Sequence, residues 1–330
     1  MAKSRFSPNR NRSRIQWLRS TVGEPLPTAC GIDQQSNCRG INTGFTSQSL
    51  VRSANWRFDH RTRQVSVRHP TPGNDALRIL LTNDDGIEAE GLQCLVDVLA
   101  KKADCFVVAP DQGRSCCSHA VTTSQSLDIV SRLKDQWTVS GTPSDCIRAG
   151  LMLLDLKPDL VISGVNHGGN LGVDILYSGT VAGAREASFL GIPSIAISQY
   201  MRRDVDRDWN VIARRAEIVL EKIIQHKRLG SGFWNVNLPA LTSQSADFDF
   251  PISICEPEPQ PLSFSFEEIS EGKEVEVKKG NNVGPDAIRT VLYKSNYQAR
   301  PRSLGSDVDL CFNGHATISW LKSDPFELRI

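Results

Sequence analysis

Short apolar runs alternate with amphipathic segments along the middle of the chain, and this pattern predicts an α/β fold. The run "LRILLTN" at 77–83 is continuously apolar and too short for a helix, which is typical of a strand buried on both faces of a parallel sheet. In the segment 91–103 that follows, four residues recur at helical spacing and would form one apolar face: Leu92, Leu95, Val96 and Leu99.

The alternation continues to about residue 227. Further strands are predicted in "DCFVVAP", "WTVS", "PDLVISG" and "IPSIAIS", and helices over 142–156, 179–191 and 209–227. Thr142 fits the N-cap of the first of these helices, with Pro143 in its first turn and Asp145 at the capping-box position. Repeated strand–helix units favour right-handed crossovers, so we expect a Rossmann-like parallel sheet sandwiched by helices.

The pattern changes beyond Gly230. "FWNVNLP" is predicted to be one more strand, and the alternating segments "SFSFEE", "EVEVKK" and "ATISWL" indicate hairpins. We therefore expect a C-terminal antiparallel hairpin extension, within a β-rich arm of about 231–330.

The first 74 residues differ from the rest in composition. Residues 1–70 contain twelve Lys and Arg against three Asp and Glu, a net charge of about +9 in a chain whose total is +1. They show no sustained periodicity, so we predict a basic, largely disordered extension over 1–74 and a single domain over 75–330. A transit peptide or a nucleic-acid-binding tail are the alternatives for this segment.

Composition restricts the class of protein. No run of 18 apolar residues occurs, so no membrane-spanning helix is expected. The nine cysteines form no C-x-x-C pair, as in the reduced thiols of a cytoplasmic protein, and a cytoplasmic location is expected. The acidic body has no basic stripe, so a nucleic-acid partner is not expected outside the first 74 residues.

Candidate chemistry lies in the loops that follow the predicted strands, where open parallel sheets bind their ligands. "TNDDGIEAEG", "APDQGRSCCSH", "SGVNHGGNLG" and "LYSGTVAG" share hydroxyls, carboxylates, amides and glycines. Adjacent Asp84 and Asp85 would repel each other unless a cation intervenes, and Mg²⁺ or Mn²⁺ prefers such oxygen donors. An Asx turn with a helix cap is the structural alternative.

The other three loops supply further polar groups. Ser115 offers a hydroxyl and Asn166 a neutral oxygen, while Ser178, Gly179 and Thr180 begin a predicted helix whose N–H groups would attract phosphate. Ordinary helix capping explains those last three equally well. A catalytic role for the histidine of the glycine-rich loop, His167, is less favoured than a solvated one.

Together these motifs resemble the SurE survival proteins, which are divalent-metal-dependent phosphatases of nucleoside monophosphates. "ILLTNDDGI", "VVAPDQGRS", "VSGTPSDC", "PDLVISGVNHGGNLG" and "YSGTVAGAREA" occur in the family order, and "GSDVDLCFNGHATISWL" is similar to the C-terminal signature. The resemblance spans about 76–322. Two positions depart from the family pattern, with Glu90 in place of proline and Cys116 in place of glycine.

The resemblance implies a set of site residues. The metal ligands fall on Asp84, Asp85, Ser115 and Asn166, and the same two aspartates are the expected catalytic residues. The substrate phosphate would be held by residues from three of the loops: Asn83, Asn170, Ser178, Gly179 and Thr180. Either a water or a carboxylate would attack phosphorus.

The predicted function is a 5'-nucleotidase with one Mg or Mn cation per subunit. Its substrates would be nucleoside 5'-monophosphates, with 3'-monophosphates as further candidates. The protein would assemble as a homodimer or homotetramer. The alternatives are a nucleotide-binding or regulatory module without turnover, and a phosphatase of the haloacid dehalogenase type. The second would need a D-x-D motif, whereas here the carboxylates are contiguous.

Overall fold

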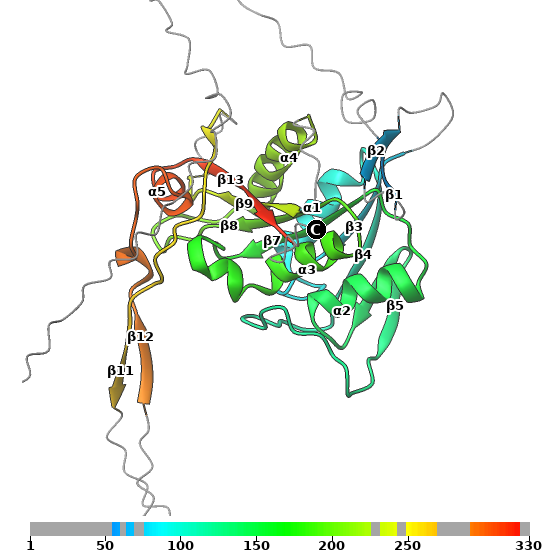
Figure 1. Cartoon of the computed structure of the whole chain (residues 1–330), viewed down its shortest axis with the longest axis horizontal. Coiled ribbons are helices and arrows are strands. Elements are labelled where there is room, and N and C mark those ends of the chain that lie inside the picture. Colours follow the sequence, from blue (N-terminus) through cyan, green and yellow to red (C-terminus); the bar gives the residue numbers. More distant parts are fainter. Residues whose placement is uncertain are drawn as a thin grey trace, which may run out of the picture. The chain divides into compact units, whose positions relative to one another are not determined.

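The computed structural model describes residues 55–59, 64–68, 76–225, 232–242, 249–268 and 291–323. Within these residues a nine-stranded sheet has the order β10-β13-β9-β8-β7-β3-β4-β6-β5 (Figure 1). Its strands are β3 Arg78–Thr82, β4 Asp104–Pro110, β5 Ile129–Leu133, β6 Gln136–Val139, β7 Leu160–His167, β8 Ser194–Gln199, β9 Gly232–Leu238, β10 Ile252–Ile254 and β13 Ala316–Lys322.

The central strands are parallel, and their order reverses beside β3. The chain runs outward from β3 to β4 and β6, then returns to place β7, β8 and β9 on the other side of β3. Loops that leave adjacent strands in opposite directions open a crevice at such a point. The carboxyl ends of β3 and β7 are therefore where this topology favours a ligand site.

Helices cover both faces of the sheet, which confirms the predicted Rossmann-like class. Ile79 and Leu81 of β3 join the apolar cluster beneath α1 (Glu90–Leu99) and α4 (Trp209–Gln225). Leu80, which points to the opposite face, joins the cluster beneath α2 (Pro143–Arg148) and α3 (Gly179–Phe189). Figure 1 shows these two helix pairs on opposite sides of the strands.

The predicted start of α2 is confirmed in detail. The Thr142 side chain accepts a hydrogen bond from the Asp145 backbone, the Asp145 carboxylate accepts one from the Thr142 backbone, and Pro143 occupies the first turn. The helix then widens into a π-helical turn over Ala149–Leu153. The remaining short helices are 3₁₀ turns at Gly172–Leu176 and Tyr297–Ala299 and the helix α5 at Asp307–Phe312.

The C-terminal region differs from the prediction in one strand. "SFSFEE" forms β11 (Phe264–Glu268), which pairs with β12 (Val291–Ser295) as the expected antiparallel hairpin. "ATISWL" instead forms β13 inside the main sheet, antiparallel to β9 and parallel to β10. Its alternating small polar residues, Thr317 and Ser319, are buried, so alternation here does not indicate a solvent-exposed face. "EVEVKK", at 274–279, lies outside the described residues.

A hairpin also occurs within the segment expected to be disordered. β1 (Asn55–Asp59) pairs antiparallel with β2 (Gln64–Arg68), with Trp56 opposite Val67 and Phe58 opposite Val65. Each strand holds only two apolar residues in alternation, too short a pattern to register as a sustained period. The rest of 1–74 lies outside the described residues, so the boundary at 74 stays a prediction.

No helix in the described part of the chain combines the length and the apolar character needed to cross a membrane.

Candidate active site

The loop after β3 presents two adjacent carboxylates because its first residue ties it into a tight turn. Asn83 is fully buried, and its side-chain amide donates to the Gly86 carbonyl (2.9 Å) and accepts from the Gly86 N–H (3.2 Å). Gly86 has a φ of +101°, and a side chain there would lie 3.2 Å from the carbonyl carbon of Gln112. Asp84 and Asp85 are the two residues between Asn83 and Gly86, so this hydrogen-bonded turn carries both carboxylates.

Asp84 is the more buried of the two acids. Its side chain is 5% exposed and accepts a short hydrogen bond from the Thr180 hydroxyl of α3. Burial raises the pKa of Asp84 to about 6, and the charge of Asp85 adds to this rise, while the Thr180 hydrogen bond opposes it. The carboxylate is thus in an environment where a positive charge would be strongly favourable.

Asp85 links the β3 loop to the end of β7. Its Oδ2 accepts a 2.9 Å hydrogen bond from the backbone N–H of His167, the residue after Asn166. The side chain is half-buried, so one face of the carboxylate stays open. This contact brings the acidic pair next to the glycine-rich loop, as the topology favours.

Ser115 belongs to a loop that is hydrogen-bonded to the same turn. The backbone N–H of Arg114, the residue before Ser115, donates to the Asp84 carbonyl (2.6 Å) and so ties this loop to the acidic turn. The next residue, Cys116, has a φ of +57°, in the left-handed region where glycine is preferred. Cys116, one of the two departures from the family pattern, therefore has a backbone conformation that glycine adopts without strain.

Asn166 lies at the carboxyl end of β7, and its amide orientation is fixed. Its Nδ2 donates to the carbonyl of Gly168 (2.8 Å), which leaves the side-chain oxygen as the group available to a ligand. Because β7 pairs with β3, Asn166 and the acidic turn share one edge of the sheet. The structure thus brings together all three segments that carry the four predicted metal ligands.

The chemistry of this donor set fits a hard divalent cation. It comprises two carboxylates, a hydroxyl and an amide oxygen, the ligand types that Mg²⁺ and Mn²⁺ accept. Within the described ranges no group of three or more His, Cys, Asp or Glu is placed to hold a metal. A cation here would therefore rely on neutral oxygens and water beside the acidic pair.

Four of the five residues predicted to hold phosphate use their side chains for internal hydrogen bonds. Asn83 shapes the turn, and Thr180 binds Asp84. Ser178 caps α3 by accepting from the N–H of Val181 (3.0 Å), as the structural alternative anticipated. Asn170 is buried, donating its backbone N–H to Asn237 and its amide to Ser198 (both 2.7 Å).

Gly179, the fifth predicted phosphate residue, packs against Asp84 of the acidic pair. A methyl group on Gly179 would lie 2.6 Å from Sγ of Cys117 and 2.9 Å from Cβ of Asp84. Only glycine lets the N-terminus of α3 approach this closely. The first turn of α3 thus supports the carboxylate of Asp84 through both a hydrogen bond and direct packing.

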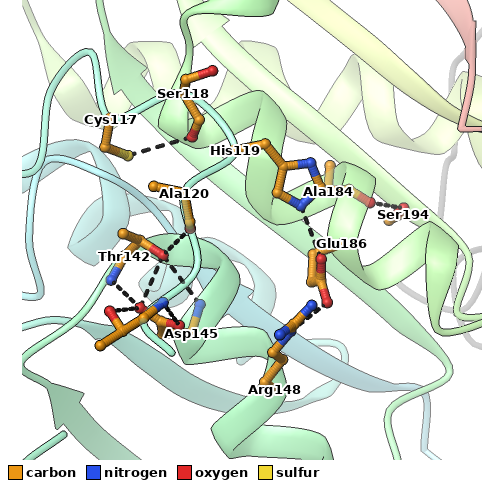
Figure 2. A network of polar contacts seen from close by, with 11 residues as sticks. Cys117, Ser118, His119, Ala120, Thr142, Asp145, Arg148, Ala184, Glu186 and Ser194 are labelled. Carbon is orange, nitrogen blue, oxygen red and sulfur yellow. Dashed lines mark hydrogen bonds and ion pairs between the residues drawn. The ribbon is translucent and has the colours of Figure 1, made fainter. Parts of the chain in front are cut away.

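Sequence reasoning missed the polar network that anchors the 117–122 loop (Figure 2). His119 contacts the buried Glu186 of α3 through Nε2 (2.8 Å), and Arg148 binds the other oxygen of Glu186 (2.6 Å). Nearby, Asp145 accepts from the Thr122 N–H (3.0 Å) and hydroxyl (2.8 Å). The capping box was visible in the sequence. The hydrogen bonds by which Asp145 also holds the 117–122 loop are tertiary contacts, which the sequence does not reveal.

Comparisons with known proteins agree with the fold and the motifs. Residues 79–256 match the family described as Survival protein SurE. A Synechocystis sp. relative with a provisional 5'-nucleotidase name is 38% identical over 74% of this chain and 100% of its own length. The 5'-nucleotidase SurE of Syntrophus aciditrophicus is 43% identical over 51% of this chain and 64% of its own. The crystal structure of the SurE protein from Aquifex aeolicus superposes with a TM-score of 0.63 at 30% identity, covering 76% of this chain and 95% of that one.

Proposed function

The chain belongs to the SurE family, and on that premise we propose that it is a 5'-nucleotidase, a divalent-metal-dependent phosphomonoesterase that converts nucleoside 5'-monophosphates to nucleoside and inorganic phosphate. Nucleoside 3'-monophosphates are further candidate substrates. Two hydrogen bonds carry the proposal, from Arg114 to Asp84 and from His167 to Asp85. They join the three ligand-bearing loops beside β3, where the strand order reverses.

Four side chains would hold the cation: Asp84, Asp85, Ser115 and Asn166. A bound Mg²⁺ or Mn²⁺ would supply Lewis-acid polarisation of the phosphate and activation of water. The protein's own contribution is to fix the donors in advance, since fixed groups need no reorganisation during reaction. Thr180 fixes Asp84, the His167 backbone fixes Asp85, and Gly168 fixes the Asn166 amide.

The two aspartates are not equivalent as catalytic groups. Asp84 is buried, and its carboxylate is enclosed by Thr180 and Gly179. Asp85 is half-buried, and only its Oδ2 accepts a hydrogen bond from the described residues. Asp85 is therefore the better candidate to accept a proton from the attacking water, whereas Asp84 serves mainly as a charge that holds the cation.

A direct assay tests this function. Purified protein is incubated with nucleoside monophosphates and Mg²⁺ or Mn²⁺, and released phosphate is measured with and without EDTA. We expect metal-dependent release that EDTA abolishes and that Asp85→Asn lowers by about 100-fold or more. The matched control is Asp97→Asn, an exposed position on α1, and this variant should hydrolyse like the wild type. Turnover that persists in EDTA, or an unimpaired Asp85→Asn, would refute the proposal.

We also propose that the protein assembles with further copies of itself through the β11–β12 hairpin. The hairpin exposes three aromatic side chains that contact one another, Phe264 and Phe266 (both 61% exposed) and Tyr293 (52%). A cluster of exposed aromatic rings is unfavourable in water and is typical of a surface that another chain covers. A second copy of the same hairpin would present matching rings.

A further inference from the structure

An arginine from a neighbouring loop lies beside the candidate active site. Arg207 is in the segment between β8 and α4, and its NH1 is 2.7 Å from Nε2 of His167. A guanidinium can only donate hydrogen bonds, so Nε2 of His167 must be the acceptor here. The imidazole of His167 therefore holds the side chain of Arg207 in a defined position.

His167 is itself well fixed, although its side chain is exposed. Its backbone N–H binds Asp85, and its ring packs edge-on against Trp209 at a centroid distance of 6.0 Å and an angle of 86°. Trp209 is wedged against α1, where a side chain at Gly91 would lie 2.9 Å from the indole. Arg207 is thus connected to the acidic pair through a single, oriented residue.

The positive charge of Arg207 has no partner carboxylate in the part of the chain that the structure describes. Two other arginines do have one: Arg114 binds Asp111 (3.0 Å) and Arg202 binds Asp204 (2.5 Å). The neighbouring Asp208 caps α4 instead, accepting from the N–H of Asn210 (3.0 Å). An exposed guanidinium held in place with donors to spare is suited to bind an oxyanion.

The site also needs such a group. The side chains predicted from the sequence to bind phosphate are neutral and have internal partners, whereas a phosphate monoester carries close to two negative charges at neutral pH. Arg207 and His167 both line an open pocket of about 1580 Å³, together with Gly168 and Gly169 of the glycine-rich loop. The backbone N–H of His167 binds Asp85, so a phosphate at the acidic pair would lie next to this part of the pocket lining.

Resting on the proposed function, we propose that Arg207 is a phosphate-contacting residue of this enzyme and that His167 is its positioning residue. The guanidinium donates to non-bridging oxygens of the phosphoryl group and so offsets negative charge that the cation alone does not balance. Donors aimed at a transferring phosphoryl group act mainly in the transition state, so removal of the guanidinium should lower kcat more than it raises KM.

Steady-state kinetics test the pair. Arg207→Gln should lower kcat/KM for nucleoside monophosphates by about 100-fold, and added guanidinium ion should restore part of the loss. His167→Ala should lower kcat/KM by a smaller factor, whereas His167→Gln should recover most of it because the amide oxygen can accept from Arg207. The matched control is Arg203→Gln, which lines the same pocket without contacting His167 and should behave like the wild type.

A binding measurement separates this inference from the proposed function. Inorganic phosphate is titrated calorimetrically into each variant in EDTA, where turnover and metal play no part. We expect Arg207→Gln to bind phosphate at least 10-fold more weakly than Arg203→Gln. If the wild type fails to hydrolyse nucleotides yet this difference is found, the proposed function fails and the anion site stands. Equal phosphate affinity and equal kcat/KM in the two variants would overturn the inference.

Discussion

The close packing of α3 against the acidic turn can be tested with a single methyl group. Gly179→Ala would place Cβ 2.6 Å from Sγ of Cys117 and 2.9 Å from Cβ of Asp84. Favourable contacts between such atoms lie at roughly 3.5–4.0 Å, so one partner must move by about 1 Å. The turn that carries Asp84 is bonded on both sides, which makes displacement of the carboxylate itself an expected part of the response.

Two magnitudes follow from this displacement. Overpacking of this kind costs about 1–3 kcal/mol of unfolding free energy. A displacement of about 1 Å at a catalytic group can lower the rate by about 100-fold, so activity should fall more than stability alone explains. The assays are chemical denaturation, for the free energy of unfolding, and phosphate release with saturating Mg²⁺ or Mn²⁺.

Two further variants separate the contacts. Gly113→Ala adds the same methyl group in the same site, but its closest contact is 3.6 Å, from the carbonyl oxygen of Asp85, so stability and activity should stay near those of the wild type. Adding Cys117→Ala to Gly179→Ala removes the sulfur contact and should restore part of the stability, while the contact with Asp84 keeps activity low. Wild-type activity in Gly179→Ala, or full recovery in the double variant, would refute this reasoning.

Two other outcomes concern the loop anchor and the hairpin. Burial would raise the pKa of Glu186, but hydrogen bonds from His119 and Arg148 outweigh it and hold the pKa below the ordinary 4.5. The stability that this carboxylate contributes is therefore present above about pH 4.5 and is lost as the pH falls through the lowered pKa. The difference in unfolding free energy between the wild type and Glu186→Gln should accordingly be large at pH 7 and shrink in acid. A constant difference would contradict the assigned role. For the hairpin, Phe266→Ser should lower the mass measured by sedimentation equilibrium. The control Leu304→Ser, at a position that is 98% exposed, should leave the mass unchanged. An unchanged mass in Phe266→Ser would exclude the hairpin as the contact between copies.

Local pattern was sufficient to predict the strands β3, β4, β6, β7, β8 and β9 and the helices that pack on them, whereas the edge strands β5 and β10 were not predicted. β3 and β8 are buried on both faces, so each is a continuous apolar or small-residue run that no amphipathic helix would show. The pattern failed for β13, whose alternation of Thr317 and Ser319 with apolar residues imitates a half-exposed strand. Those hydroxyls are buried by neighbours from distant parts of the chain, which single-sequence alternation does not reveal.

The candidate site divides in the same way. Adjacent acids before a glycine, and a carboxamide among glycines, are local signals, and they suffice to propose Asp84, Asp85 and Asn166 as ligands. The supporting contacts are not local, since Thr180 reaches Asp84 across 96 residues of sequence and Arg207 reaches His167 across 40. Residues expected to touch phosphate also cap a helix or shape a turn, and because both tasks use the same side chains, the sequence alone does not separate the two roles.

The replacement of glycine by Cys116 bears on how this site keeps its shape. A left-handed φ costs a residue other than glycine about 1–2 kcal/mol, and the strain falls directly beside Ser115. The loop is nevertheless bonded on both sides of the strained residue, by Arg114 N–H to Asp84 and by Ser118, whose N–H and hydroxyl donate to the carbonyls at 177 (3.0 Å) and 176 (2.8 Å). Because these bonds fix the ends, the strain has no easy release that would move the hydroxyl of Ser115, and the loop retains a conformation that glycine would adopt freely.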